Sequence, residues 1–307
     1  MRIAVILSTG GSHKSVSSEQ SGRIVAQGLS RAGHEATVSL VAPLAAEGAV
    51  RAALRSDVRA IVVGGTDEIV SRATNLIADT PKALGVVPLG RSNPLGRALR
   101  VPEELEHAVD ALGRGTIVRV DVGEVNGRVF AVQAALGLYP WLLRHRALLQ
   151  RASITSDSPR LRRALWYAVA QQPLISAYME YNGLLRAVRT PWLAITNTAV
   201  ADDLEPSSGD DGQDTHRLRL YVGRPRSVAG WLRRLVELAA AGRLSAEALL
   251  AGRSDNPGLE PTETRALIVR PRRRRLLVAL DGSVELLEAP LRCHVRRAAL
   301  SVLRPAP

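Results

Sequence analysis

The sequence is poor in lysine, in aromatic side chains and in cysteine. Lys14 and Lys82 are its only lysines, Phe130 is its only Phe, and aromatic residues make up 3% of the chain. The single cysteine, Cys293, excludes an internal disulfide and a thiolate metal cluster, which fits the reducing cytoplasm. No apolar run approaches the roughly 18–20 residues that span a bilayer. The apolar stretch near the N-terminus, about five residues long, is too short for a signal peptide and predicts a first β-strand.

The rest of the composition is that of a globular protein. With 307 residues, 46% of them hydrophobic, the chain can bury a substantial core and has room for two domains. Because aromatic residues are scarce, this core must be built mainly from Ala, Val, Leu and Ile. The histidines show no metal-ligand spacing, so we assign them to the core or the surface and name no metal ligands.

The net charge of +12 comes almost wholly from arginine. One interpretation is a compositional bias that replaces Lys by Arg. The other is a surface that meets polyanions such as acidic lipid headgroups, nucleic acid or nucleotide phosphates. Nucleic-acid binding would require aromatic side chains interleaved with the arginines, and these are absent. The sequence therefore predicts no nucleic-acid partner and favours an anionic membrane surface.

The densest arginine cluster lies between two strand-like segments. It consists of Arg270 and of Arg272, Arg273, Arg274 and Arg275. The flanking segments are Ala266–Val269 and Leu276–Leu280. Because both flanks have strand character, we expect the cluster to lie on a hairpin connection.

The first third of the chain alternates strand and helix patterns. Strands separated by helices of this length imply parallel β-α-β crossovers and a doubly wound sheet. The expected strands are Ile3–Leu7, Ala36–Val41, Ala60–Val63 and Gly85–Pro88, and the expected helices are Ser18–Ala32, Ala45–Leu54, Asp67–Ala78 and Pro102–Leu112, the last preceded by a turn at Asn93–Leu99.

From Val118 onward the pattern changes to β segments joined by turns. Asn126-Gly127, between the first two of them, is a strong hairpin signal. The expected segments are Val118–Val125, Arg128–Ala134, Ser176–Tyr181, Leu193–Thr196, Leu218–Val222, Leu267–Val269, Leu276–Leu280, Val284–Leu287 and a last strand at Ala298–Leu303, with helices at 159–170 and 228–241. Mostly antiparallel strands after an α/β unit predict a second domain, a β-sandwich. The predicted boundaries are 1–117 for the α/β nucleotide-binding domain, 118–295 for a β-rich substrate or lid domain, and 296–307 for a segment that returns to the first domain.

Two strand-loop-helix passages stand out in the α/β part. The first is Ala60-Ile-Val-Val-Gly-Gly-Thr-Asp-Glu68, and the second is Leu84-Gly-Val-Val-Pro-Leu-Gly-Arg-Ser-Asn93. Glycines let backbone N–H groups approach an anion, and a helix N-terminus adds the positive end of its dipole. Both loops fall at the carboxyl ends of parallel strands, where ligands of such sheets bind. Together they predict a nucleotide site.

The two passages resemble the signature of the soluble diacylglycerol kinase catalytic family, which includes bacterial lipid kinases and sphingosine kinases and is distantly related to NAD kinases. That signature is a strand followed by Gly-Gly-Asp-Gly-Thr, a helix, and then Pro-Leu-Gly-Thr-Gly-Asn-Asp. Gly64 to Glu68 occupy the first place and Pro88 to Pro94 the second. Further matches keep the family's order over essentially the whole chain; they are Val120 to Asn126, Phe130, Asn197, Asp281-Gly282 and Val302 to Pro305.

The resemblance implies an NAD-kinase-like, doubly wound α/β N-terminal domain and a mainly antiparallel β-sandwich C-terminal domain. It implies transfer of the ATP γ-phosphoryl group to a hydroxyl of a lipid, lipid-like or small substrate, with Mg²⁺ and without a covalent enzyme intermediate. The catalytic base would be Asp281, a role that its position in the family pattern implies, whereas local sequence alone favours an ordinary Asp-Gly turn. The nucleotide-binding residues would be Gly64, Gly65, Thr66, Asp67, Glu68, Leu89, Gly90, Arg91, Ser92 and Asn93. We further expect a cytoplasmic protein that works peripherally at the inner membrane face, and a homodimer stays open.

The first loop departs from the family signature. Thr66 stands for its Asp, Asp67 for its second Gly and Glu68 for its Thr. A carboxylate at position 67 would meet triphosphate oxygens, which is unfavourable unless a metal bridges them. Asp67 can itself serve as the loop carboxylate, or Asp67 and Glu68 can merely cap the following helix.

The second loop departs as well, since Arg91 replaces Thr, Ser92 replaces Gly and Pro94 replaces the final Asp. Arg91 can contact phosphate in bidentate fashion, or it can pair with an acidic residue of the first loop and close the site. These changes leave three hypotheses. The leading one is a lipid kinase, and the alternative is a catalytically inactive relative that acts as a ligand-binding or regulatory module. The third is a divergent enzyme that uses another nucleotide.

Overall fold

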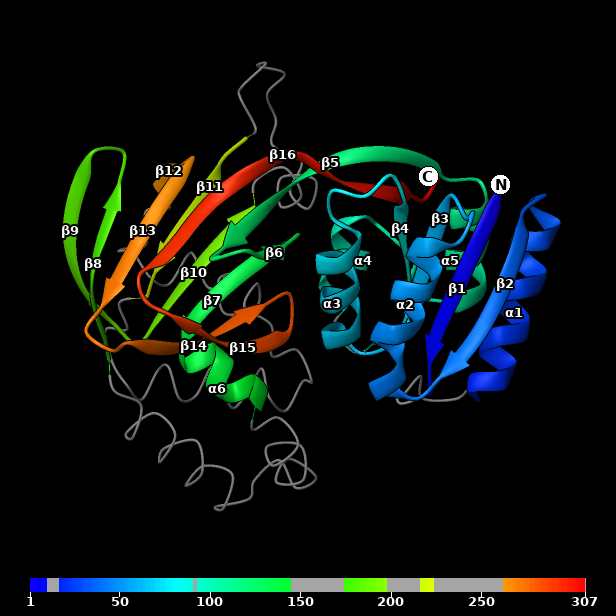
Figure 1. Cartoon of the computed structure of the whole chain (residues 1–307), viewed down its shortest axis with the longest axis horizontal. Coiled ribbons are helices and arrows are strands. Elements are labelled where there is room, and N and C mark those ends of the chain that lie inside the picture. Colours follow the sequence, from blue (N-terminus) through cyan, green and yellow to red (C-terminus); the bar gives the residue numbers. More distant parts are fainter. Residues whose placement is uncertain (10–16, 91–92, 145–173, 198–215, 224–261, 307) are drawn as a thin grey trace.

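The computed structural model describes residues 1–9, 17–90, 93–144, 174–197, 216–223 and 262–306. In these residues an α/β part, which holds both termini, lies beside a β-rich part (Figure 1). The helices that the sequence predicts at 159–170 and 228–241 lie outside the described residues. None of the described helices is both long enough and apolar enough to span a bilayer.

The α/β part alternates parallel strands with helices, as the sequence predicts. Its strands run in the spatial order β2-β1-β3-β4, and all three neighbouring pairs are parallel. Observed bounds differ from the predicted ones by a few residues at the ends. The strands are β1 (Arg2–Ser8), β2 (Glu35–Val41), β3 (Ala60–Gly64) and β4 (Ala83–Val87), and the helices are α1 (Ser18–Arg31), the 3₁₀ turn η1 (Pro43–Ala45), α2 (Ala46–Arg55), α3 (Asp67–Ile77), α4 (Pro94–Ala98) and α5 (Leu105–Gly113).

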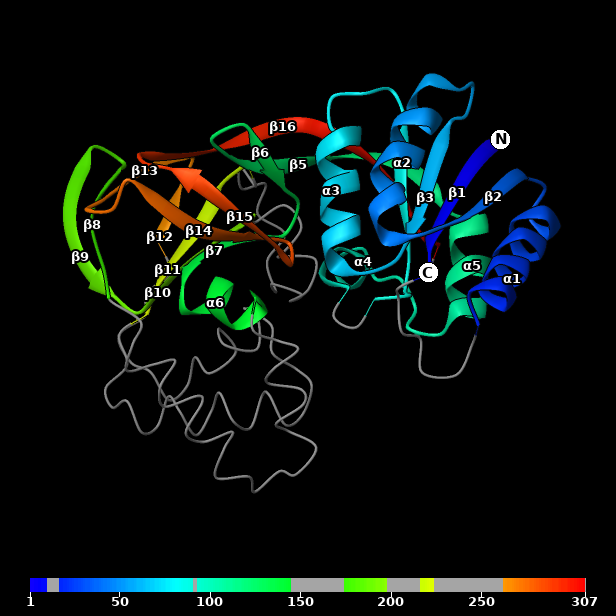
Figure 2. The ribbon, with the colours of Figure 1, turned by 60° about the horizontal axis from the view of Figure 1, so that its bottom comes forward.

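Helices cover both faces of this sheet. α1 and α5 pack together on one face, where Val25 and Leu29 meet Val109 and Leu112 (Figure 2). α2 and α3 cover the other face, and their apolar side chains form a second cluster with the strands. β3 and β4 are buried at every residue because both of their faces are covered. A ligand can therefore contact these two strands only at their ends.

One long strand connects the two parts of the chain. β16 (Leu291–Arg304) pairs in parallel with β4 through Ser301 and Val302, and antiparallel with β5 (Thr116–Val125) along most of its length. Its register shifts between Arg296 and Leu300. The strand thus passes from the β-rich part into the α/β sheet (Figure 1, red). The domain boundaries 1–117, 118–295 and 296–307 stay a prediction.

The β-rich part is a sandwich of two sheets. One is the far end of the mixed sheet, which continues from β16 through β13 and β8 to β9, and the other is an antiparallel sheet in the order β12-β11-β10-β7-β14-β15. A core of aliphatic side chains fills the space between them, together with Phe130 and Cys293. The elements are β6 (Arg128–Phe130), β7 (Gln133–Gly137), α6 (Leu138–Arg144), β8 (Ile175–Tyr181), β9 (Leu184–Thr190), β10 (Trp192–Asn197), β11 (Leu218–Val222), β12 (Thr262–Thr264), β13 (Ala266–Pro271), β14 (Arg275–Leu280) and β15 (Ser283–Glu288).

Two sequence predictions for this part are wrong. The single strand expected at Arg128–Ala134 is two strands, because the chain changes sheets between β6 and β7. The hairpin expected around the arginine cluster does not form, since β13 pairs with β16 and β8 while β14 pairs with β15 and β7. The cluster instead lies where the chain crosses from one sheet to the other. The sequence also missed α6, β9 and β12.

The hairpin predicted at Asn126-Gly127 is confirmed. Val125 pairs with Arg128, and the two turn residues have φ values of 50° and 80°. Positive φ at both central positions is the geometry of a type I′ turn, which Asn-Gly adopts with little strain.

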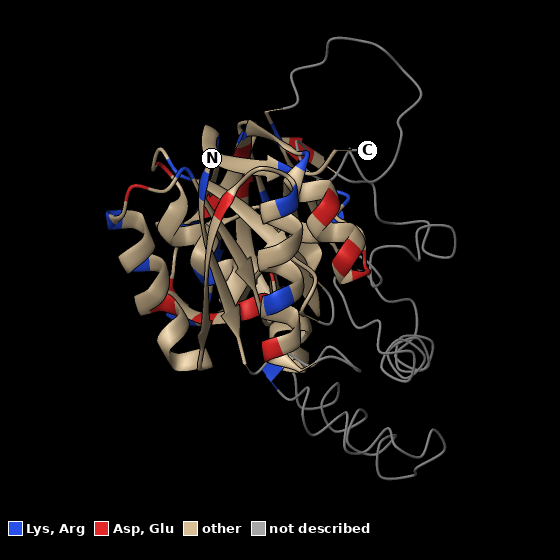
Figure 3. Ribbon diagram, turned by 90° about the vertical axis from the view of Figure 1, so that its right-hand side faces the viewer, with Lys and Arg blue, Asp and Glu red and all other residues tan. Residues whose placement is uncertain are grey.

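Charge is distributed differently in the two parts. Basic and acidic residues are interspersed over the helices of the α/β part (Figure 3). In the arginine cluster, Arg270 pairs with Glu180 at 2.8 Å and Arg275 with Glu288 at 2.9 Å. The three arginines between them are exposed, and no described carboxylate pairs with them; they are Arg272, Arg273 and Arg274.

Candidate nucleotide site

The first glycine loop joins β3 to α3. Gly64 ends the strand in a fully packed position, because a Cβ there would lie 2.6 Å from Val87 and 2.8 Å from Leu7. Thr66 is the N-cap residue of α3, with extended backbone and no side-chain cap bond. Gly64 therefore allows the close approach of β3 to its neighbours.

The second glycine loop joins β4 to α4. Leu89 is buried and belongs to the core cluster that contains Leu7 and Val87. Asn93 has φ of 39°, in the left-handed region, and its Oδ1 accepts the N–H of Gly96 at 3.2 Å, which caps α4. Arg91 and Ser92, which the sequence predicts to bind nucleotide, lie outside the described residues.

Asp67 joins the two loops. Its side chain is 9% exposed, and Oδ1 accepts the backbone N–H of Asn93 at 2.9 Å. A Cβ on Gly90 would lie 2.7 Å from the carbonyl oxygen of Gly65 and 3.0 Å from Asp67 Oδ1. A Cβ on Gly282 would lie 2.6 Å from Asp67 Cβ. The carboxylate is thus enclosed by backbone from three loops, which goes beyond a helix-capping role.

The side chain of Glu68, unlike that of Asp67, lies on the surface. It is exposed in the first turn of α3, and its Oε1 accepts from Arg72 Nη2 at 2.7 Å, one helical turn away. A negative charge at that position stabilises the helix N-terminus. The structure therefore separates the two acidic residues, with Asp67 between the loops and Glu68 on the surface.

A polar stripe on α3 binds the β-rich part. Ser71 Oγ donates to the carbonyl oxygen of Leu280 at 2.9 Å and lies 3.3 Å from Ser283 Oγ. Asn75 bonds both backbone groups of Val129, at 2.7 and 2.8 Å. The sequence predictions do not include this stripe. The sequence feature that could have revealed the stripe is the four-residue spacing of positions 67, 71 and 75. This spacing places three polar side chains on one face of the helix.

Asp281 occupies a type I′ turn between β14 and β15, with φ of 46° there and 94° at Gly282. Its carboxylate is 4% exposed and accepts three backbone N–H groups, from Ala131 at 2.5 Å, Val132 at 3.0 Å and Gln133 at 2.8 Å. These bonds hold the segment where the chain changes sheets between β6 and β7.

A second polar cluster surrounds Asp121 on β5. Asp121 Oδ1 accepts the N–H of Ala298 at 2.8 Å, in the irregular part of β16, while His216 Nδ1 donates to Oδ2. Asn197 Nδ2 donates to the carbonyl oxygens of Asp121 at 2.7 Å and Ala131 at 3.0 Å. The sequence predicts only a core or surface role for His216, because nothing in it places this residue beside Asp121.

The carboxylates near the two glycine loops can be compared with those that hold Mg²⁺ in nucleotide sites. In phosphate-transfer sites Mg²⁺ is usually held by one or two carboxylates together with the substrate phosphates. Asp67, buried between two loops at the carboxyl ends of β3 and β4, fits such a carboxylate. Within the described ranges no three of His, Cys, Asp or Glu lie close enough to hold a metal ion alone. The residues thus fit a metal that is bound jointly with the nucleotide.

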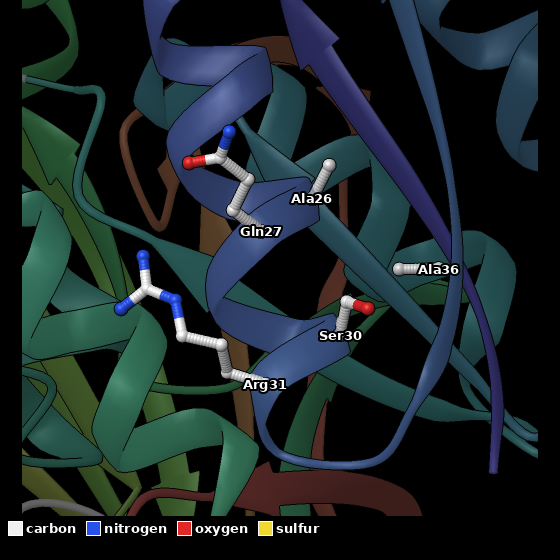
Figure 4. Close-up of a pocket in the computed structure, with 5 residues that line it drawn as sticks. All are labelled: Ala26, Gln27, Ser30, Arg31 and Ala36. Atoms are coloured by element: carbon white, nitrogen blue, oxygen red, sulfur yellow. The ribbon is translucent and has the colours of Figure 1, made fainter.

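A surface hollow of about 520 Å³ lies elsewhere, over the C-terminal half of α1 (Figure 4). Its lining is Ala26, Gln27, Ser30, Arg31 and Ala36. α1 runs back from the loop end of the sheet, so this hollow lies toward the opposite end from the glycine loops. It brings together no acid, base or nucleophile suited to phosphoryl transfer.

The N-terminal part of the chain is similar in sequence to a known protein family. Residues 3–125 match the family model of the diacylglycerol kinase catalytic domain. The chain is 40% identical over 87 residues to a diacylglycerol kinase of Staphylococcus carnosus and 34% identical over 87 residues to one of Staphylococcus aureus. Each alignment covers 28% of this chain and 28% of the relative, so the chain matches well under two thirds of those proteins.

The whole fold has a structural counterpart. A crystal structure of a diacylglycerol kinase from Bacillus anthracis superposes with a TM-score of 0.68 and 15% identity, covering 99% of this chain and 96% of that one. The predicted fold class, an α/β N-terminal part followed by a mainly antiparallel β-sandwich, is confirmed.

Proposed function

Residues 3–125 belong to the diacylglycerol kinase catalytic domain family, and on this premise we propose that the protein transfers the γ-phosphoryl group of ATP to a hydroxyl of a lipid or lipid-like substrate. The meeting of the two glycine loops carries this proposal. Both loops lie inside the matched segment, at the carboxyl ends of adjacent parallel strands, and Asp67 bonds the one to the other. Such strand ends are where ligands of doubly wound sheets bind.

In this account each loop has a defined role. The backbone at Gly65, Thr66 and Gly90 faces the phosphates, with Glu68 at the outer edge, and Asn93 fixes the second loop by capping α4. Asp67 supplies the carboxylate that faces a Mg²⁺ ion arriving with ATP, which when bound neutralises phosphate charge. Leu89 anchors the start of the second loop in the core.

Asp281 contributes to the site by fixing a neighbouring backbone segment. The resemblance assigns it the role of base, and its turn lies against Asp67 and α3. Because its oxygens already accept three backbone N–H groups, we propose that it positions the segment at Ala131, Val132 and Gln133. Residues 1–117 with 296–307 would form the nucleotide-binding domain and 118–295 the substrate domain.

A lipid substrate requires contact with a membrane, and we propose that the exposed arginines supply it at the inner face of the cytoplasmic membrane. Arg272, Arg273 and Arg274 lie at the sheet crossing without described acidic partners. Arg272→Glu/Arg273→Glu should reduce salt-sensitive binding to vesicles that contain phosphatidylglycerol. The control is Arg23→Glu/Arg59→Glu, which reverses two exposed charges in the α/β part. Equal binding of the wild type to neutral and anionic vesicles would point to compositional bias instead.

A second candidate function follows from the same buried carboxylate. If no metal accompanies the ligand, Asp67 acts as an internal anion that already holds the N–H of Asn93 and repels phosphate. The protein would then be an inactive relative that binds a different ligand or a partner.

The test is direct phosphoryl transfer. The wild-type protein is incubated with γ-³²P-labelled ATP, Mg²⁺ and 1,2-dioctanoylglycerol in mixed micelles, and labelled lipid is separated and counted. The kinase proposal expects labelled lipid that requires both Mg²⁺ and the acceptor. Absence of label on this acceptor, on a monoacylglycerol and on a long-chain amino alcohol would support the second candidate.

A further inference from the structure

Strand β9 forms one edge of the ten-stranded sheet. It lies at the end of the β-rich part that is farthest from the α/β part (Figure 1, green), and among the described residues it pairs with β8 alone. All of its residues, Leu184–Thr190, pair with β8 in one unbroken register without a bulge, and none of them is a proline. A regular edge with unpaired backbone groups can pair with a further strand, and natural proteins usually interrupt such edges.

Large apolar side chains are exposed beside this edge. Leu184 and Leu185 are 60% and 67% exposed, and Tyr178, which pairs with Ala187 from β8, is 56% exposed. Leu185 and Ala187 share the outer face of the sheet with Tyr178, because direct partners and residues two apart point to the same side. Three of the seven exposed large hydrophobic side chains in the described ranges thus lie on one hairpin, which indicates an interaction surface.

The turn before β9 determines which backbone groups reach the free edge. Asn182 and Gly183 have φ values of 49° and 73°, the geometry of a type I′ turn, and Tyr181 pairs with Leu184. Such a turn directs the N–H of its last residue, Leu184, toward the carbonyl oxygen of its first. This direction alternates along an antiparallel strand, so the groups at the free edge are those of Leu185, Ala187 and Arg189.

Charge restricts how two copies of this edge can pair. In a symmetric antiparallel pair one residue lies directly opposite its own copy. A centre at Arg186 or at Arg189 would oppose like charges, which is destabilising. A centre at Ala187 pairs every residue of β9, whereas any other centre leaves part of the strand unpaired. It places Leu185 opposite Arg189, and Arg186 opposite an uncharged valine, so no like charges meet.

The register about Ala187 also brings opposite charges together. Arg189 of the second copy would lie opposite Leu185, whose partner on the other side is Glu180 of β8. Neighbouring strands are about 4.8 Å apart, so a guanidinium two strands away on the same face can reach this carboxylate. Glu180 bonds Arg270 at 2.8 Å, and a carboxylate can accept further donors. Arg189 is exposed, and no described carboxylate of its own chain pairs with it.

We propose that the protein forms a homodimer in which two β9 strands pair antiparallel about Ala187, so that two ten-stranded sheets join edge to edge. Main-chain hydrogen bonds supply the affinity, and the alternating side chains supply the specificity. Leu185 and Tyr178 of both copies gather around the two-fold axis. The strands β16, β13 and β8 lie between β9 and the strands that carry the glycine loops, so this inference is independent of the proposed function.

The first test is the mass of the protein in solution, measured by light scattering after size-exclusion chromatography. The wild type should have twice the 33.0 kDa of one chain. Ala187→Arg and Ala187→Glu each place like charges opposite each other and should be monomers. An equal mixture of these two variants should restore the dimer, which misfolded variants could not do. Ser39→Arg, at an exposed position of β2, the edge strand at the other end of the sheet, is the matched control and should stay dimeric.

The second test is disulfide crosslinking across the two-fold axis. In a hydrogen-bonded antiparallel pair the two Cα atoms are about 5.5 Å apart, which a disulfide can span. Ala187→Cys should therefore form a crosslinked dimer under mild oxidation, whereas Ser39→Cys should not. The native Cys293 is buried and does not contribute.

Two outcomes would overturn the homodimer through β9. One is a monomeric wild type, which would leave the edge to an extended segment of another protein, and the other is a dimer that persists in Ala187→Arg. A dimer that the mixture does not restore, or that Ala187→Cys does not crosslink, would overturn the pairing about Ala187.

Discussion

Asp67 Oδ1 accepts the backbone N–H of Asn93 across 2.9 Å, so the carboxylate of the first glycine loop fixes the second. The two residues are 26 positions apart in the sequence and meet only because β3 and β4 are adjacent and parallel. The glycine that the signature of the diacylglycerol kinase family has at this position could not make this bond, because it has no side chain. The bond is therefore a property of this chain that the signature does not contain.

Two substitutions of Asp67 distinguish the stabilising effect of its hydrogen bond to Asn93 from the effect of its negative charge. Asp67→Ala removes the acceptor, and we expect the free energy of unfolding to fall by about 1.5–3 kcal/mol, as for hydrogen bonds to charged groups. Asp67→Asn keeps an oxygen that can accept the N–H of Asn93, so its loss should be less than about 1 kcal/mol. Urea unfolding of both variants measures the difference, and equal losses would show that charge rather than the bond matters.

The same Asp67→Asn variant distinguishes the two candidate functions. If Asp67 faces a metal that arrives with ATP, the affinity for Mg·ATP should fall about tenfold, which calorimetric titration can follow. If Asp67 is an internal anion, the affinity should rise because the competing charge is gone. Glu104→Gln, which neutralises an exposed carboxylate at the N-cap of α5, is the control and should leave the affinity unchanged.

Gly90→Ala should force the loops apart. The added Cβ would lie 2.7 Å from the carbonyl oxygen of Gly65. Because this oxygen belongs to the backbone, it cannot move aside as the end of a flexible side chain could. We expect a loss of about 1–3 kcal/mol in unfolding free energy and weaker binding of Mg·ATP. Gly48→Ala is the matched control, since its Cβ meets no heavy atom within 4 Å on helix α2. That variant should gain about 0.5–1 kcal/mol, and a stable Gly90→Ala would contradict the close approach of the loops.

Asp281→Ala should lower both stability and transfer. It leaves three buried N–H groups without an acceptor, so we expect a loss of about 3 kcal/mol or more in urea unfolding. Glu288→Ala, on the same hairpin, removes only an exposed ion pair with Arg275 and should cost less than about 1 kcal/mol. A variant that keeps its stability but loses transfer would instead identify Asp281 as the base itself.

Cys293 should be unreactive in the folded protein. Burial between the two sheets of the sandwich raises the pKa of its thiol to about 12, so near pH 8 it stays protonated and shielded. Ellman's reagent should label less than one tenth of the protein in buffer and all of it in guanidinium chloride, because Cys293 is the only cysteine. Rapid labelling of the native protein would show that the sandwich opens at β16.

The sequence predicts the parallel strands and helices of the α/β part well, because each is a local pattern of apolar residues bounded by Gly or Ser. It also predicts the two glycine loops, since strand ends are visible in the pattern. It cannot predict that Arg128–Ala134 divides between two sheets, because the carboxylate that bonds the crossing segment is Asp281, about 150 residues away. Contacts such as His216 with Asp121 likewise depend on tertiary packing that brings β5 beside the start of β11.

The most direct test of the central claim, a nucleotide site between the two glycine loops, is thermal unfolding of the wild-type protein with and without millimolar Mg·ATP. A ligand at about one hundred times its dissociation constant adds about 2.7 kcal/mol to the free energy of unfolding. We predict a rise in melting temperature that follows the Mg·ATP concentration and is reduced in Gly90→Ala. An unchanged melting temperature at millimolar Mg·ATP would contradict the account.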